Sequence, residues 1–149
     1  MLMEYTGLKP EYSAMLKQAY EAMARAYVPY SGFQVGAALL DAEGQTHYGC
    51  NVENAAYGPT NCAERTALFR AIADGRSAGE FRAIAVIGDT DGPIAPCGIC
   101  RQVMVELCAP DTPVIMGNLR GAWSIATVAE LLPGAFTPAS LNKEEHELT

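Results

Sequence analysis

The sequence has no long hydrophobic run. Its longest uninterrupted apolar stretches, Ala37–Leu40 and Ala83–Ile87, fall far short of the roughly 20 residues that a membrane-spanning helix needs. The first residues also lack a basic segment followed by an apolar one, so no secretory signal is visible. We therefore expect a cytoplasmic protein that does not enter a membrane.

Basic residues are scarce. The chain has 10 Lys and Arg against 17 Asp and Glu, which gives a formal net charge of −7 at pH 7. Nucleic acids and anionic membrane surfaces are usually bound through basic patches. The charge therefore argues against both as partners and favours a small-molecule ligand.

The five cysteines are an odd number, which in a chain without an export signal favours free or metal-bound thiols in a reducing compartment over a disulfide framework. A length of 149 residues favours a single domain spanning 1–149, whose core needs neither disulfides nor a metal for its stability. A metal site would therefore have a catalytic role rather than a structural one.

The charged residues near the C-terminus predict a disordered acidic tail over about 142–149.

Hydrophobic periodicity and turn residues predict the order of helices and strands. Helices are expected over 10–27, 61–74 and 97–108, and a capping box from Thr127 to Glu130 begins a short last helix. Strands are expected over 34–40, 45–52, 81–88, 113–116 and 123–126. This order predicts an α/β fold with three layers, in which a mixed five-stranded sheet carries helices on both faces.

Three cysteines fall at predicted helix starts. Cys97 and Cys100 are three residues apart, so they share one helix face. Between Cys62 and Cys97 lie 34 residues, about one αβ unit. The partial positive charge of a helix N-terminus lowers the pKa of a thiol and favours the thiolate that metals bind. Three thiolates would form a tetrahedral zinc site with one open position, whereas a structural zinc site would have a fourth protein ligand.

Three other side chains are weaker candidates for that fourth position. Cys108 lies eight residues beyond Cys100, about 12 Å along a helix, which is too far. Cys50 and His47 fall on a predicted strand and stay possible, although free cysteine is more often simply buried.

Glu64 is the natural group to move protons at such a site. The alternative is structural, because Asn61 and Glu64 have the spacing of a capping box with Asn61 as the N-cap. Glu64 also falls on the apolar stripe of Ala67, Leu68 and Ala71, so it should point inward, where a carboxylate is costly. Combined with the thiols, this position favours a catalytic role.

Arg65 has an electrostatic argument of its own. Zinc with three thiolates carries a net negative charge, and hydroxide would add to it. A guanidinium can hydrogen-bond the thiolate sulfurs and offset that charge. The alternative for Arg65 is a surface salt bridge.

At this point the motifs resemble a known family. Residues 62–64 read Cys-Ala-Glu and residues 96–100 read Pro-Cys-Gly-Ile-Cys, the signature of zinc-dependent nucleobase deaminases. The segments 30–39 (YSGFQVGAAL), 49–58 (GCNVENAAYG) and 97–102 (CGICRQ) are similar to the short-chain cytidine deaminases. The similarity runs from about residue 10 to 141.

The resemblance implies a fold of the cytidine deaminase type and a zinc-dependent deamination of cytidine and 2′-deoxycytidine in pyrimidine salvage. Cys62, Cys97 and Cys100 would hold one zinc ion per chain. Glu64 would take a proton from the zinc-bound water, deliver it to N3 of the pyrimidine and then help to protonate the departing amine. Hydroxide would attack C4, and ammonia would leave.

The resemblance also implies the substrate contacts. Asn51 and Glu53 would bind a ribose hydroxyl, Phe33 would pack on the nucleoside, and the Ala63 backbone N–H would hold the base carbonyl. Phe136 would stack on the base from a neighbouring subunit, because members of this length form homotetramers with shared active sites. From the residues alone, Asn51 and Glu53 fit a turn at a strand end and Phe33 fits the core.

Three other functions are compatible with parts of the pattern. A Cys-x-x-Cys redox protein would explain Cys97 and Cys100 but neither Cys62 nor Glu64. A structural zinc module would need a fourth protein ligand. A deaminase of aminonucleoside antibiotics would share the metal motifs, but it generally lacks the Asn-x-Glu-Asn segment found here at 51–54.

Overall fold

The computed structural model describes residues 4–141, so the predicted acidic tail lies outside the described residues. The helices are α1 (Pro10–Met23), α2 (Ala63–Ala73), α3 (Gly98–Leu107) and α4 (Val128–Leu131), followed by a 3₁₀ turn at Pro138–Leu141. The strands are β1 (Val35–Asp41), β2 (Thr46–Cys50), β3 (Phe81–Gly88), β4 (Pro113–Asn118) and β5 (Trp123–Thr127). No helix within 4–141 is long and apolar enough to cross a membrane.

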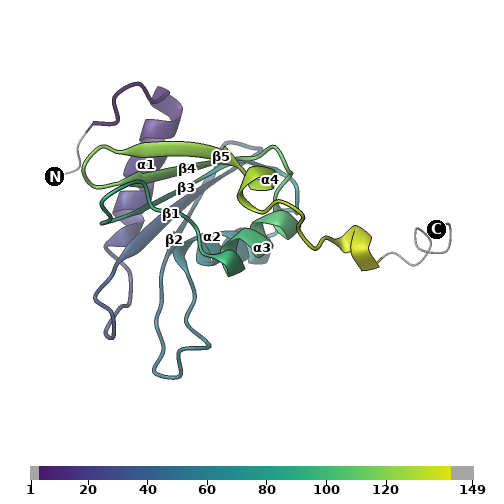
Figure 1. The fold of residues 1–149 in the computed structure, drawn as a ribbon, viewed down its shortest axis with the longest axis horizontal. Coiled ribbons are helices and arrows are strands. Elements are labelled where there is room, and N and C mark those ends of the chain that lie inside the picture. Colours follow the sequence, from purple (N-terminus) through teal and green to yellow (C-terminus); the bar gives the residue numbers. More distant parts are fainter. Residues whose placement is uncertain (1–3, 142–149) are drawn as a thin grey trace.

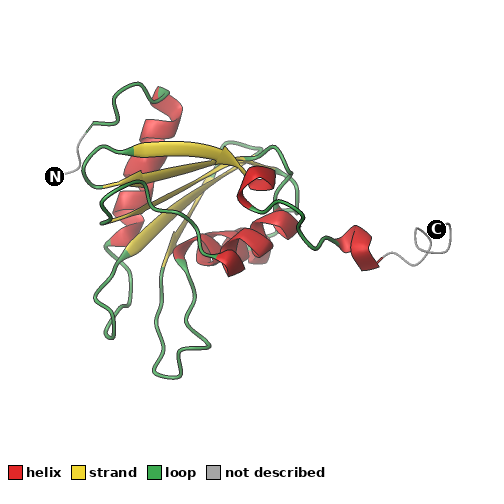
Figure 2. Cartoon of the chain, in the orientation of Figure 1, coloured by secondary structure: helices red, strands yellow, loops and turns green. Residues whose placement is uncertain are grey.

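The five strands form one mixed sheet in the order β2-β1-β3-β4-β5 (Figure 1). β3 and β4 are parallel, and the other neighbouring pairs are antiparallel. α1 covers one face of the sheet, and α2 and α3 cover the other (Figure 2). The predicted α/β class, the mixed sheet and the helices on both faces are confirmed.

Alternate residues of the central strands separate the two cores. Successive strand side chains point to opposite faces, so Ile84 and Val86 of β3 pack towards α2 and α3, whereas Ala85 and Ile87 pack towards α1. Seven of the eight residues of β3 are buried. A strand that is covered on both faces has no polar side to alternate with, which explains the continuous apolar run in its sequence.

The first helix is shorter than its apolar stripe predicts. α1 ends at Met23, and the prediction of a helix to residue 27 is wrong. The backbone N–H of Tyr27 donates to the carbonyl of Asn51 (3.0 Å), and the Tyr27 carbonyl accepts from the N–H of Glu53 (2.8 Å). These bonds join the end of the helical region to the segment after β2, and Tyr27 itself is exposed.

Two glycines allow helices to approach the sheet closely. A Cβ at Gly36 would lie 1.9 Å from the carbonyl oxygen of Ala19 in α1, and a Cβ at Gly49 would lie 2.2 Å from the carbonyl oxygen of Ala63 in α2. Contacts this short with backbone atoms leave no room for a side chain. Gly49 therefore fixes how the start of α2 rests on β2.

We expect Gly49→Ala to destabilise the fold by about 3 kcal/mol and to lower the melting temperature by roughly 6–12 °C, because the new Cβ must push α2 away from the strand. Gly92→Ala is the matched control, since nothing lies within 4 Å of a Cβ at Gly92. Thermal unfolding of both variants checks the prediction, which equal melting temperatures would contradict.

Asp41, at the end of β1, is 1% exposed. Its carboxylate lies 2.9 Å from Nε2 of His47 and 3.0 Å from Nε of Arg76, and it accepts hydrogen bonds from the backbone N–H groups of Glu43 and Gln45. Burial opposes ionisation, but these contacts outweigh it and lower the pKa of Asp41 to about 2.

The lowered pKa predicts an acid-sensitive contribution to stability. The ionised form of Asp41 is favoured in the fold, so its contribution is complete above the ordinary carboxyl pKa of about 4 and is lost as the pH falls towards 2. We expect urea unfolding to show wild type losing roughly 2 kcal/mol relative to Asp41→Asn over this range. Parallel pH profiles for the two proteins would contradict the assignment.

Candidate metal centre and active site

The metal-binding residues lie where two helices begin on the same face of the sheet. α2 follows β2, α3 follows β3, and each helix has a cysteine as its N-cap residue, Cys62 and Cys97 respectively. Both cysteines have extended backbone angles, so each side chain leaves the chain just before the helix starts. Cys100 lies in the first turn of α3 and is fully buried.

The sulfur atoms of the three cysteines lie close together. The Sγ atoms of Cys62, Cys97 and Cys100 all lie within 4.8 Å of one another, and those of Cys62 and Cys97 are 3.7 Å apart. All three cysteines are free thiols. A tetrahedral zinc ion with Zn–S bonds of about 2.3 Å requires sulfurs about 3.8 Å apart, so this spacing fits the metal that the motif predicts.

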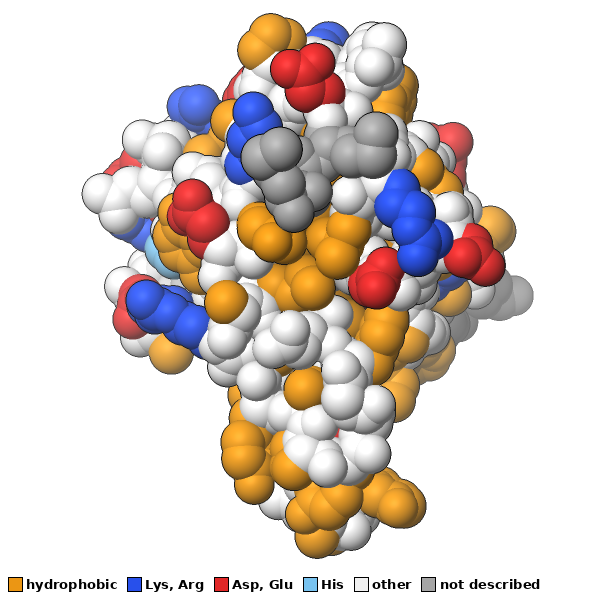
Figure 3. All heavy atoms as spheres, turned by 90° about the vertical axis from the view of Figure 1, so that its left-hand side faces the viewer, with side chains coloured by type: hydrophobic (Ala, Val, Ile, Leu, Met, Phe, Trp, Pro, Cys, Tyr) orange, Lys and Arg blue, Asp and Glu red, His pale blue; other side chains and the backbone are white. Residues whose placement is uncertain are grey.

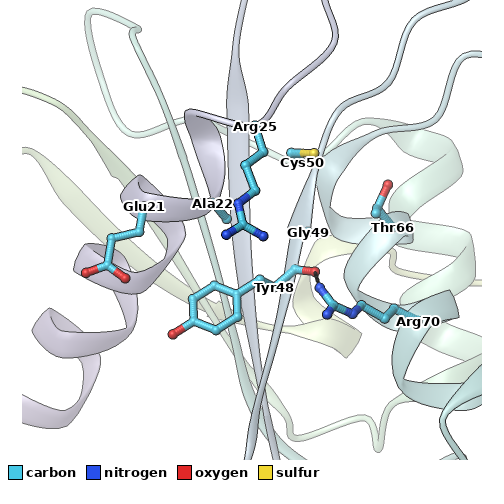
Figure 4. Close-up of a pocket in the computed structure, with 8 residues that line it drawn as sticks. All are labelled: Glu21, Ala22, Arg25, Tyr48, Gly49, Cys50, Thr66 and Arg70. Carbon is cyan, nitrogen blue, oxygen red and sulfur yellow. Dashed lines mark hydrogen bonds between the residues drawn. The ribbon is translucent and has the colours of Figure 1, made fainter.

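The other candidate ligands lie elsewhere. His47 contacts the Asp41 carboxylate, and Cys108 is buried at the far end of α3 as its C-cap residue. Cys50 lines a cavity of about 360 Å³ between α1, β2 and α2, together with Arg25 and Arg70 (Figure 4). Among the described residues, the group positioned for a metal is therefore the three-thiol set, which leaves a fourth coordination position to a non-protein ligand.

The charges around the sulfurs favour a thiolate. Nη2 of Arg65 donates to Sγ of Cys62 at 3.3 Å. The Cys100 thiol and Arg65 lower the pKa of Cys62, and the same contact with Cys62 raises the pKa of Cys100. The Nε of Arg65 is buried and has no partner among the described protein groups. The Nη2 atom of Arg65 thus contacts sulfur, and the role of Arg65 in offsetting the thiolate charge stays a prediction.

The contact between Arg65 and the Cys62 sulfur predicts that Arg65 slows the release of a bound metal. We expect Arg65→Ala to release zinc roughly ten to a hundred times faster to a chromophoric chelator, because the thiolate charge loses its neighbouring cation. Arg70→Ala is a matched control on the same helix, where the guanidinium donates to the Tyr48 carbonyl instead. Equal release rates for the two variants would refute the charge argument.

Glu64 is 4% exposed and lies in the first turn of α2. The helix begins one residue later than the capping box requires, with Cys62 as N-cap and no side-chain cap. The side chain of Asn61 instead donates to Thr66 Oγ1, which donates to the Cys62 carbonyl. The capping alternative for Glu64 is therefore wrong.

Burial raises the pKa of Glu64 to about 7, and the neighbouring Cys62 sulfur acts in the same direction. A carboxyl whose pKa lies near neutrality can both accept and release a proton at physiological pH. Its position next to the three sulfurs is therefore suited to general acid and base chemistry.

The predicted substrate-binding residues surround the loop before β1. The amide of Asn51 accepts from the Val35 N–H and donates to the Phe33 carbonyl, each at 2.8 Å. The Glu53 carboxylate accepts from the N–H groups of Tyr30 and Ser31 and from the Ser31 hydroxyl. Both side chains thus hold this loop, and an amide or carboxylate retains further hydrogen-bonding capacity for a ligand.

The remaining predicted contacts are distributed over three elements. Phe33 is 39% exposed, and its ring lies near Gly88 at the end of β3. Ala63 is buried at the first position of α2, where a helix leaves its backbone N–H without an intrahelical acceptor. Phe136 is 59% exposed on the C-terminal segment, which extends away from the body of the fold (Figure 1).

Sequence patterns do not predict a role for Gly49 at the site, although Gly49 sets the position of α2, the helix that begins at Cys62. A glycine inside a strand pattern is the available signal, because it often marks a close approach of another backbone. Arg101 and Gln102 fall within the motif at 97–102, but the motif assigns them no role. Their contacts join segments far apart in sequence, which no local pattern reveals.

Three thiols beside a buried carboxyl, at helix starts on a mixed sheet, define a zinc-dependent hydrolase of the deaminase type. The family model described as "Cytidine and deoxycytidylate deaminase zinc-binding region" matches residues 9–116. The chain belongs to the cytidine deaminase family, and the predicted membership and zinc cofactor are confirmed.

Relatives and solved structures agree with this assignment. The chain is 58% identical to a cytidine deaminase of Halalkalibacterium halodurans, over 86% of this chain and 96% of the relative. The crystal structure of cytidine deaminase from Burkholderia pseudomallei matches with a TM-score of 0.83 and 53% identity, covering 87% of this chain and all of that chain. The corresponding enzyme structure from Mycobacterium tuberculosis matches with a TM-score of 0.73 and 35% identity, over 86% and 98% of the two chains.

Proposed function

We propose that this protein hydrolyses cytidine and 2′-deoxycytidine to uridine and 2′-deoxyuridine with release of ammonia. The observation that carries the proposal is the convergence of Cys62, Cys97 and Cys100 beside the buried Glu64. Cys62, Cys97 and Cys100 would hold a zinc ion, which when bound would supply a Lewis acid that makes water a nucleophile near neutral pH. The family's named members support the choice of substrate.

Glu64 moves the protons in this reaction. Its carboxylate accepts a proton from the attacking water and delivers it to N3 of the pyrimidine, while oxygen bonds to C4. The remaining proton of that water then goes to the exocyclic amine, the C4–N bond breaks, and ammonia leaves as the C4 carbonyl forms. Glu64 suits both steps because it is buried in the first turn of α2, beside Cys62, where one carboxyl can act first as base and then as acid.

The substrate is held by the residues around this carboxyl. We assign Asn51 and Glu53 to a ribose hydroxyl, the Ala63 N–H to the base carbonyl, and Phe33 to packing against the nucleoside. The hydrogen bonds from Asn51 and Glu53 to the loop 30–35 support this assignment, since they fix both side chains before a ligand arrives.

A spectrophotometric assay on cytidine tests the activity directly. We expect the ultraviolet absorbance to change as uridine forms, with one ammonia released per uridine. Absence of turnover by protein that carries one zinc per chain would contradict the proposal, and turnover of an aminonucleoside antibiotic in place of cytidine would redirect it to that substrate class.

We also propose a homotetramer in which active sites are shared, formed by one domain per chain and located in the cytoplasm, where thiols stay reduced. Two features support the assembly. Aromatic side chains are exposed in the loops 24–34 and 51–61, where Tyr27, Tyr30 and Tyr57 are 54–75% exposed. Hydrophobic side chains gather at the lower end of the molecule in Figure 3. The exposed Phe136 lies on the C-terminal segment, whose last described residues extend away from the body of the fold (Figure 1).

Co-expression of two inactive chains tests the shared site. A chain with Glu64→Gln supplies an intact Phe136, and a chain with Phe136→Ala supplies an intact Glu64. We expect mixed assemblies to recover activity towards cytidine above that of either variant alone, and light scattering to give four chains. A monomer, or no recovery in proven mixed assemblies, would contradict sharing.

A further inference from the structure

Arg101 and Gln102 follow the metal-binding cysteines on α3, and the proposed reaction gives them no task. Arg101 is half-buried, and its guanidinium contacts two different segments. Nε donates to the carbonyl of Pro96 at 2.8 Å, and Nη1 donates to the carbonyl of Leu131 at 2.9 Å. One planar group therefore joins the loop before α3 to the end of α4.

The carbonyls of Pro96 and Leu131 belong to segments with different structural roles. Pro96 immediately precedes Cys97, so the bond to its carbonyl fixes the backbone that leads into a metal-binding thiol. Leu131 is the last residue of α4, from which the chain continues to Phe136. A bond to a charged guanidinium is stronger than one between neutral groups. Arg101 thus fixes two segments relative to α3: the loop that leads into Cys97, and the start of the C-terminal segment at Leu131.

Gln102 holds the same C-terminal segment at its other end. Its Nε2 donates to the backbone carbonyl of Phe136 at 2.8 Å. Two successive residues of α3 therefore fix the segment at residue 131 and again at residue 136, while the Phe136 ring itself stays exposed. The segment between these two points is short, so fixing both ends sets the direction in which the ring points.

We propose that Arg101 and Gln102 are positioning residues that hold the C-terminal segment, and with it Phe136, on α3 of its own chain, so that the ring is placed for the site it shares with a neighbouring subunit. Arg101 at the same time anchors the loop that leads into Cys97. This inference rests on the proposed function in assigning Phe136 to the base. Only an arginine presents two divergent donors in a rigid plane, whereas lysine offers a single point charge. Arginine at 101 is therefore required for the double contact.

Two variants test the contacts of Gln102 and of Arg101 separately. Gln102→Met keeps the length of the side chain and removes the donor to Phe136. Arg101→Lys keeps the charge and cannot bond both carbonyls in the observed geometry. Arg82→Lys is the matched control, because Arg82 also donates to a backbone carbonyl, that of Ala42 at 2.7 Å, from an exposed position at the start of β3.

Three measurements on the zinc-loaded enzyme test the proposal: zinc release to a chelator, amide hydrogen exchange over residues 131–141, and steady-state kinetics with cytidine. For Gln102→Met we expect exchange of the segment to quicken and KM to rise about tenfold, with kcat within about twofold and zinc release unchanged. For Arg101→Lys we expect zinc release and segment exchange both to quicken about tenfold. Arg82→Lys should match wild type.

Unchanged zinc release and unchanged exchange in Arg101→Lys would overturn the anchoring role. Faster exchange without any change of KM in Gln102→Met would overturn the positioning role. Zinc release and hydrogen exchange do not depend on turnover, so a wild-type protein that fails to deaminate cytidine would refute the proposed function and leave the anchoring test intact. If Arg101→Lys does not fold, Gln102→Met still decides whether the segment is positioned.

Discussion

Glu64→Gln is expected to lower kcat for cytidine by at least about a thousandfold, because the amide can neither accept the proton from water nor return it to the amine. The variant should keep one zinc per chain, since the three thiols are untouched. It should also be at least as stable as wild type, because glutamine fills the same buried space without a carboxyl that burial penalises. Kinetics, zinc analysis and thermal unfolding of one preparation check all three statements.

Glu130→Gln is the matched control for this variant. Glu130 also lies in the first turn of a helix, where its carboxylate caps α4 together with Thr127. Glutamine can make the same cap, so activity should be close to wild type. Near-normal turnover in a folded, zinc-loaded Glu64→Gln protein would remove Glu64 from the mechanism.

Cys100→Ser is expected to weaken zinc binding by more than about a hundredfold and to abolish activity with it. Loss of even an indirect partner of a metal ligand costs about ten- to a hundredfold in affinity, and this variant loses a ligand itself. Cys100 is fully buried in the first turn of α3, so solvent cannot readily replace it. Competition with a chelator of known zinc affinity measures the change.

Cys50→Ser is the control that shows whether the loss of any thiol, and not only of a zinc ligand, lowers zinc affinity. Cys50 is half-buried at the end of β2 and lies outside the three-thiol group. We expect its replacement to leave zinc affinity and turnover near wild type. If Cys50→Ser lowered zinc affinity as much as Cys100→Ser, the assignment of the ligands would be wrong.

The sequence predicts most of the fold because its patterns are local. The continuous apolar run of β3 reflects a strand covered on both faces, and the capping box of Thr127 and Glu130 marks the start of α4. The end of α1 could not be predicted in the same way. Tyr27 continues the apolar stripe, but its backbone bonds to Asn51 and Glu53, which are 24 and 26 residues away, override the local preference.

The metal site is predictable for a related reason. Cysteines at helix starts follow from capping and from the spacing of residues on a helix face, so the sequence alone suffices to group Cys62, Cys97 and Cys100. The role of Gly49 depends on how closely α2 approaches β2, and that of Arg101 on two carbonyls 35 residues apart. Such contacts arise from packing between elements and have no periodic signature.

X-ray absorption at the zinc edge of the purified protein tests the central claim most directly. The account predicts three sulfur neighbours at about 2.3 Å and one oxygen neighbour at about 2.0 Å, which is the pattern of an open catalytic site. Four sulfurs, a histidine nitrogen among the neighbours, or a protein that binds no zinc would contradict it.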